Sequence, residues 1–142
     1  MYLLDVNVLV PLFWPAHEFH RRARGWFDHH AENGWATCPF TQAAFVRLIS
    51  NPSFSRDALT AQNALALLDS NLVHPHHHFW PEEISLKEAL APLRPKLVGH
   101  RQITDAYLLG LTIFRKGKLA TFDSAISSLL PKEKVPEFIQ QL

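Results

Sequence analysis

Three aspartates stand at points in the sequence where a carboxylate is able to do chemistry. Asp5 interrupts the apolar run MYLLDVNVLV, Asp105 lies in ITDAYLLGLTI, and Asp123 follows the apolar segment KLATF. Burying an unpaired carboxylate costs several kcal/mol, on the order of the whole stability of a small domain. Asp5 must therefore lie where a strand ends, either capping the next helix or held by a cation.

The elements expected around these residues place the three carboxylates at one edge of a sheet. Residues 1–10 are rich in Val and Leu, which is typical of a strand covered on both faces, and residues 118–122 predict another strand. A helix is expected to begin just before Asp105. Parallel strands end at a common edge and crossover helices can begin there, so Asp5, Asp105 and Asp123 can converge.

Converging carboxylates favour a divalent cation, because they repel one another and raise one another's pKa. Mg²⁺ prefers oxygen ligands and takes a few carboxylates together with waters and substrate phosphates. Each aspartate alone also has an ordinary explanation. Asp105 is favourable in a first helical turn, Asp123 is able to cap the next helix, and Asp5 or Asn7 is able to cap a helix after the first strand. The coincidence of all three on one inferred edge favours a metal site.

Strands and helices alternate along the whole sequence. Strands are predicted over residues 1–10, 35–38, 76–80, 118–122 and 135–142. Helices are predicted over 16–32, 41–50 behind a Thr41 cap, 56–70, 85–92 behind a Ser85–Glu88 capping box, 104–116 behind a Thr104 cap, and 124–130. Pro11 and Pro15 are expected to bracket a turn. The alternation predicts one α/β domain over residues 1–142, with helices on both faces of a mostly parallel sheet.

Composition indicates the class of protein but does not indicate a binding partner. The 142 residues are 47% hydrophobic and 19% charged, which is typical of a globular domain. A net charge of +1 is too even to indicate or to exclude a nucleic-acid partner. The single cysteine, Cys38, cannot form an intrachain disulfide, and the first residues lack the basic start of a secretory signal. No apolar run approaches the ~18 residues of a membrane span, so we expect a cytoplasmic protein.

Four polar residues near the aspartates are candidate substrate contacts. Asn7 and Thr121 either hydrogen-bond the carboxylates and hold them in place, or satisfy local backbone groups. His100 and Arg101 precede the helix of Asp105 and are expected at the same edge. Arg101 is able to bind a phosphate or to pair with a carboxylate, and His100 to contact a base or a phosphate, although both also suit an ordinary polar loop.

The histidines at positions 74, 76, 77 and 78 raise the question of zinc, but alternate residues of a strand point to opposite faces and no cysteine completes a ligand set. A surface or half-buried strand is the favoured interpretation. The two aromatic residues that follow, Phe79 and Trp80, are expected in the core.

The segments LLDVNVLV, CPFTQAAFVRLISNP, FWPEEISLKEALAP, LVGHRQITDAYLL and LATFDSAI resemble the ordered blocks of PIN-domain proteins, in particular the VapC-type toxins of bacterial toxin–antitoxin pairs. The resemblance covers nearly the whole chain. It implies a three-layer α/β/α sandwich and an endoribonuclease that depends on Mg²⁺ or Mn²⁺. It further implies an RNA substrate, a cognate VapB-like antitoxin and a homodimer. By the same resemblance Asp5, Asp105 and Asp123 match the acidic, catalytic metal-site positions.

One position departs from that pattern. Many PIN domains carry a glutamate in the helix after the second strand, where this sequence has Ala44. Gln42 would take its place only if the helix were rotated. The number of metal ions is therefore open. A PIN-like module that binds RNA or protein without cleaving it is an alternative, and a small-substrate phosphohydrolase is disfavoured because no phosphate-cradling glycine loop is present.

Overall fold

The computed structural model describes residues 1–142 and contains one five-stranded sheet in the order β3-β2-β1-β4-β5. All four pairs of neighbouring strands are parallel, which confirms the predicted parallel sheet. The strands are β1 (Tyr2–Leu4), β2 (Trp35–Thr37), β3 (His77–Phe79), β4 (Lys118–Thr121) and β5 (Ile139–Gln141).

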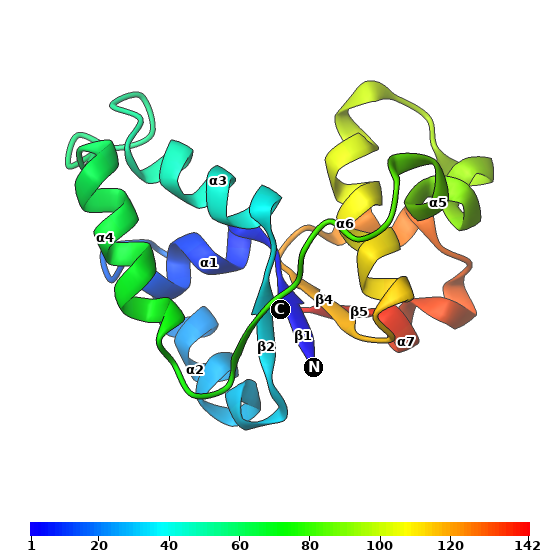
Figure 1. The fold of residues 1–142 in the computed structure, drawn as a ribbon, viewed down its shortest axis with the longest axis horizontal. Helices are drawn as coiled ribbons and strands as arrows, with labels where there is room; N and C mark the ends of the chain where they lie inside the picture. The colour runs from blue at the N-terminus through cyan, green and yellow to red at the C-terminus, as the bar shows by residue number, and fades with distance from the viewer.

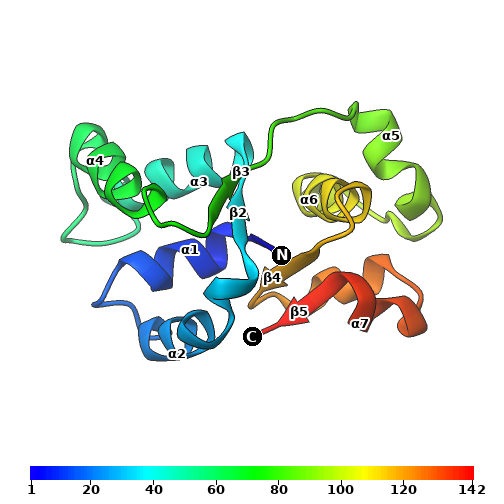
Figure 2. The ribbon, with the colours of Figure 1, turned by 60° about the horizontal axis from the view of Figure 1, so that its bottom comes forward.

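Helices cover both faces of the sheet and complete the predicted three-layer sandwich. Helices α1 to α4 pack on one side and α5 to α7 on the other, as the two ribbon views show (Figure 1, Figure 2). The α-helices are α1 (Val6–Phe13), α2 (His20–His30), α3 (Pro39–Ile49), α4 (Ala61–Leu72), α5 (Leu86–Leu90), α6 (Ile103–Phe114) and α7 (Val135–Phe138). Short 3₁₀ helices are η1 (Ala31–Asn33), η2 (Ala91–Lys96), η3 (His100–Gln102), η4 (Ser124–Leu129) and η5 (Lys132–Lys134).

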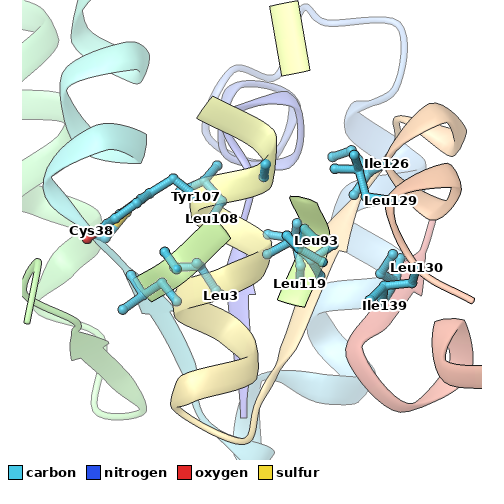
Figure 3. Packing of buried hydrophobic residues seen from close by; sticks show 14 of the residues in the cluster. Leu3, Cys38, Leu93, Tyr107, Leu108, Leu119, Ile126, Leu129, Leu130 and Ile139 are labelled. Atoms are coloured by element: carbon cyan, nitrogen blue, oxygen red, sulfur yellow. The ribbon is translucent and has the colours of Figure 1, made fainter. Parts of the chain in front are cut away.

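The sheet divides the buried side chains into two cores. Successive residues of a strand point to opposite faces. Leu3 therefore packs with Leu119 and Leu108 under α6, where Figure 3 shows the cluster, while Leu4 packs against α1 and α3 on the other face. The central strand β1 is apolar, as expected for a strand covered on both faces, whereas the edge strands β3 and β5 carry histidines and glutamines.

The first strand is much shorter than predicted. The prediction of a strand over residues 1–10 with a turn at Pro11 was wrong beyond Leu4, because Val6–Phe13 is helix α1 and contains Pro11. A short apolar run that is buried on several sides has the same pattern in a strand and in a helix, so periodicity does not separate them. Asp5 has an extended backbone (φ −63°, ψ 154°) and marks the change.

Other boundaries shift by a few residues. Helix α4 begins at Ala61 rather than at residue 56, and α6 begins at Ile103 behind Gln102, so Thr104 is not its cap. The predicted final strand is split into α7 and β5. The Ser85–Glu88 capping box is confirmed, with the Ser85 Oγ accepting from the Glu88 N–H at 3.3 Å.

The histidine-rich segment forms the edge strand β3, as predicted. Trp35 Nε1 donates to His74 Nδ1 at 3.2 Å, and His77 Nε2 lies 2.8 Å from Thr37 Oγ1, so these rings stabilise the junction with β2. Trp80 is buried as expected, but Phe79 is 52% exposed, because edge strand β3 turns its side chain outward. None of the helices is long and apolar enough to span a membrane.

Helix α6 crosses the sheet at very close range to α5. A Cβ added at Gly110 would lie 2.2 Å from the carbonyl oxygen of Ala89, so only glycine permits this approach. The helix runs back from the carboxyl ends of the strands, because β4 follows it in parallel with β1. Asp105 in its first turn is thereby placed at the edge where β1 and β4 end.

Candidate active site

The pairing of β1 with β4 places Asp5 beside the end of β4. Leu4 is opposite Ala120, and the Asp5 N–H continues the ladder by donating to the Ala120 carbonyl at 3.0 Å. Thr121 and Asp123 follow directly on β4. Two acids far apart in sequence are therefore brought to one edge by strand register alone, as the sequence predicted.

Asp5 is the only Asp or Glu among the buried residues, with 4% of its surface exposed. It occupies the N-cap position of α1, yet its side chain makes no capping hydrogen bond. Two side chains donate to it instead: Asn7 Nδ2 and Thr121 Oγ1 reach the same carboxylate oxygen, Oδ2, at 2.7 and 2.8 Å. Helix capping therefore does not explain why a carboxylate is buried here.

Asn7 and Thr121 serve both of the roles left open by the sequence. They hold the Asp5 carboxylate, and they also satisfy backbone groups, since Asn7 Oδ1 accepts from the Phe122 N–H at 2.9 Å and Thr121 Oγ1 accepts from the Asp123 N–H at 3.0 Å. A fixed network of this kind restricts the orientation of the carboxylate.

The acids influence one another electrostatically. Burial raises the pKa of Asp5 to about 6, and the nearby Asp105 carboxylate adds to the rise, while the hydrogen bond from Thr121 opposes it. Burial also raises the pKa of Asp105, with a further contribution from Asp123. Asp105 is thus the neighbour of both other acids, and its charge couples the three positions.

No cationic side chain compensates these charges. The ion pairs of the chain join Arg24 to Asp28 and Arg115 to Glu83, and neither involves the acids of this edge. A buried carboxylate with a carboxylate neighbour and no ion-pair partner fits a divalent cation. No three His, Cys, Asp or Glu side chains are arranged to hold a metal ion together. Mg²⁺ commonly uses only one or two carboxylates and completes its shell with water, so Asp5 and Asp105 suffice in number.

Comparison with known proteins identifies the fold family. The family model described as PIN domain matches residues 2–129. This chain belongs to the PIN-domain family. Among curated proteins it is 41% identical to Ribonuclease VapC39 of Mycobacterium tuberculosis over 125 residues, which is 88% of this chain and 90% of that protein. It is 43% identical to Ribonuclease VapC38 of the same species over 129 residues, which is 91% of this chain and 89% of that protein.

A solved structure agrees with this assignment at the level of the fold. The crystal structure of VapBC2 from Rickettsia felis, bound to a DNA fragment from its promoter, contains a chain that aligns with a TM-score of 0.69 and 14% identity. The alignment covers 99% of this PIN domain and 98% of that chain. The expected three-layer PIN architecture is therefore confirmed.

Asp123 of this PIN domain does act as a helix cap. Its Oδ1 accepts from the Ala125 N–H at 2.8 Å at the start of η4, and the side chain is exposed. Capping and proximity to Asp105 coexist, because the second carboxylate oxygen is not used in the cap. The role of Asp123 at the metal centre stays a prediction.

The helix that carries a glutamate in many PIN domains offers no acid here. Ala44 is half-buried on α3, and Gln42 donates from Nε2 to Thr37 Oγ1 at 2.8 Å, so its amide is already engaged. Gln42 therefore does not replace the missing ligand. The acids that influence one another at this edge are Asp5, Asp105 and Asp123.

His100 and Arg101 lie on η3, immediately before α6, and both are exposed. Arg101 forms no ion pair, so it does not neutralise the acids. Sequence reasoning missed the aromatic residues at the same edge. Phe19, within the helix predicted over 16–32, is 41% exposed and stacks on Phe122, and Arg22 lies over the same Phe122 ring. The position of Phe122 between Thr121 and Asp123 was the available hint.

Proposed function

We propose that this PIN domain is a divalent-metal-dependent endoribonuclease and the toxin of a toxin–antitoxin pair. Its relatives at 41% and 43% identity are named ribonucleases and are matched over nearly their full length. The observation that carries the proposal is the burial of Asp5 beside Asp105 without a cationic partner. The fold would not retain such an arrangement for stability, because it costs free energy.

Asp5 and Asp105 would hold the metal ion, and Asp123 would act through a bound water. A bound Mg²⁺ or Mn²⁺ would supply Lewis acidity to a phosphodiester oxygen and lower the pKa of a coordinated water. We favour Mg²⁺ because every candidate ligand is a carboxylate oxygen.

The other residues of the edge would prepare the carboxylates and the substrate. Asn7 and Thr121 fix Oδ2 of Asp5 through donated hydrogen bonds, so the acid does not have to reorganise when RNA arrives. Arg101 and His100 are exposed at the start of α6, where they are free to donate to a phosphate. The RNA backbone would lie along this edge.

The test is substitution of the two acids. Asp5→Asn and Asp105→Asn should each lower Mg²⁺- or Mn²⁺-dependent cleavage of a fluorescent RNA by about 100-fold or more, since each removes a carboxylate ligand but keeps the side-chain shape. Asp69→Asn, on the exposed face of α4, is the matched control and should cleave at the wild-type rate. Thermal unfolding checks that each variant is folded.

Two results would contradict the assignment. Full activity in both acid variants would exclude these residues from the chemistry. RNA binding by the folded wild-type protein without cleavage in any divalent cation would favour the non-catalytic module.

We further propose that the partners are a VapB-like antitoxin and a second copy of this chain. The solved neighbour belongs to VapBC2 from Rickettsia felis, which supports an antitoxin partner. Co-expression with a VapB-like antitoxin should give a stable complex whose mass, by light scattering, corresponds to two copies of this chain. A complex with a single copy would reject the homodimer.

A further inference from the structure

An apolar cavity of about 250 Å³ lies directly beside the acidic edge. Its walls come from α1, from the α1–α2 connection, from α3 and the segment after it, and from the residue after β4. The wall residues on which the argument depends are Asn7, His17, Glu18, Phe19, Phe54 and Phe122. At this volume the cavity is slightly smaller than the ~300–1,000 Å³ of drug-sized ligand pockets and suits one flat ring system.

Three phenylalanines present ring surface around this cavity. Phe19 stacks on Phe122 with ring centroids 5.2 Å apart and an interplanar angle of 21°. Phe54 is 40% exposed and packs edge-on against Trp14 at 6.1 Å, which holds its ring in place. Exposed aromatic rings that are fixed by neighbouring rings form a platform on which another planar group stacks at little cost in conformational entropy.

The cavity also carries polar groups suited to a heterocycle and its phosphate. The guanidinium of Arg22 lies 5.5 Å from the centroid of the Phe122 ring, so a cation flanks the platform. His17 Nδ1 accepts from the Phe19 N–H at 3.1 Å, which leaves its Nε2 as the donor of the neutral ring. The Glu18 carboxylate is an acceptor on the same wall.

Asn7 connects the wall of this cavity to the Asp5 carboxylate. Its side chain is part of the cavity wall, donates to Asp5 Oδ2 at 2.7 Å and accepts from the Phe122 N–H at 2.9 Å. A group seated against Phe122 is therefore separated from the acidic edge by one side chain. That spacing corresponds to a nucleobase whose own phosphate, or the adjacent one, is the phosphate that reacts.

We propose that this cavity is a nucleobase subsite in which Phe19, Phe54 and Phe122 stack one unpaired base of the RNA substrate, while Arg22 attracts the flanking phosphate. The inference depends on the proposed ribonuclease function, because it supplies the substrate class. Single-stranded RNA is recognised mainly by stacking of splayed bases on aromatic and arginine planes, which is the inventory found here. A partner protein would need only the apolar rings, whereas the adjacent cation and the shared Asn7 favour a nucleotide.

The experiment measures base stacking without cleavage. Short single-stranded RNAs carrying one 2-aminopurine are titrated with protein in EDTA, since stacking on an aromatic ring quenches this base. We expect wild-type protein to quench the probe at one position of the RNA. Phe19→Leu and Phe54→Leu should each weaken binding about 5- to 20-fold and abolish that quenching, in line with the known contribution of base–aromatic stacking.

The matched control is Phe114→Leu at the far end of α6. Phe114 is 54% exposed, like the platform residues, but it lies nine residues along the helix from Asp105, or roughly 14 Å. This variant should bind and quench like wild type. Phe122 is left intact because it adjoins Asp123.

A second arm uses cleavage in Mn²⁺. Removing the base at the quenched position should slow cleavage by wild-type protein and have little further effect on Phe19→Leu. If wild-type protein does not cleave at all, the proposed function fails, while the EDTA titration still decides the subsite. Wild-type binding and quenching in both Phe19→Leu and Phe54→Leu, or equal loss in Phe114→Leu, would overturn the subsite.

Discussion

The two ends of α6 differ in whether their charged side chain has a partner of opposite charge. At its amino end Asp105 lies beside Asp5 and Asp123, and burial and like charge raise the pKa of Asp105. At its carboxyl end Arg115 pairs with Glu83 and lies over the Trp80 ring at 5.7 Å. Helix α6 thus has one acid without a counter-charge at its amino end, and a paired cation follows its carboxyl end.

This difference distinguishes charged side chains that are paired within the fold from charged side chains that are left for a ligand. At the Arg115 end, the half-buried guanidinium has the usual partners, a carboxylate of opposite charge and the face of an aromatic ring. At the Asp105 end, burial and like charge disfavour the ionised acids, and a fold retains such a cost where a ligand supplies the missing charge. The comparison can be tested by displacing α6 from α5, and then by changing each end of α6 in turn.

The largest effect is expected from Gly110→Ala, in the middle of α6. The new methyl group would lie 2.2 Å from the Ala89 carbonyl oxygen, so α5 and α6 must separate. We expect a loss of about 3 kcal/mol in the free energy of unfolding, measured with urea, together with reduced cleavage, because both ends of the helix move.

Gly25→Ala is the control for this substitution. Gly25 lies inside α2 and nothing is within 4 Å of an added Cβ, so alanine should stabilise the protein by about 0.5–1 kcal/mol through helix propensity. Equal stability of the two variants would show that the α5–α6 contact is not tight.

A smaller effect concerns the acidic end and its dependence on pH. Folding raises the pKa of Asp5 from 3.8 to about 6, so the folded protein binds more protons than the unfolded chain between these values. The free energy that Asp5 contributes to folding is therefore fully present below about pH 4 and is lost as pH rises through 6. In EDTA, Asp5→Asn should gain stability relative to wild type between pH 4 and pH 7, by on the order of 2 kcal/mol.

Urea unfolding of both proteins across this pH range measures the difference. Mn²⁺ at pH 7 should stabilise wild type and leave Asp5→Asn nearly unchanged, because only a protein that binds the ion gains from it. If the free energies of unfolding of wild type and Asp5→Asn in EDTA ran parallel from pH 4 to pH 7, folding would not raise the pKa of Asp5.

The smallest effect is expected at the carboxyl end of α6. Arg115→Gln removes the pair with Glu83 and the contact with Trp80, but the two charged side chains are 31% and 35% exposed, so water screens much of the interaction. We expect a loss of up to about 1 kcal/mol and unchanged cleavage. A large loss of cleavage activity in Arg115→Gln would mean that both ends of α6 contribute to function.

The architecture could be predicted from the sequence because strand and helix patterns depend on residues that are close together in the chain. Alternation of strand and helix patterns predicted a parallel sheet, and the placement of Asp5 and Asp123 after apolar strands predicted that both lie at one edge. The Ser85–Glu88 box needs only neighbouring residues and was also predictable. The family followed from ordered blocks of residues in the same way.

Local patterns failed where burial depends on the partner. The run from Val6 to Val10 has no polar face, so nothing in it distinguishes a strand from a helix that is covered on several sides. Phe19 falls within the helix predicted over 16–32, but α2 begins only at His20, so Phe19 lies outside the helix and stacks on Phe122 from the other end of the chain.

The sequence by itself therefore indicated the fold class, the family and a common edge for Asp5 and Asp123, since the alternation of strands and helices is a short-range pattern. Only the tertiary structure decided how Asp5 is held by Asn7 and Thr121, and that Phe19, Phe54 and Phe122 surround one cavity. Contacts between residues a hundred positions apart depend on how the layers pack against each other, and no local pattern records that packing.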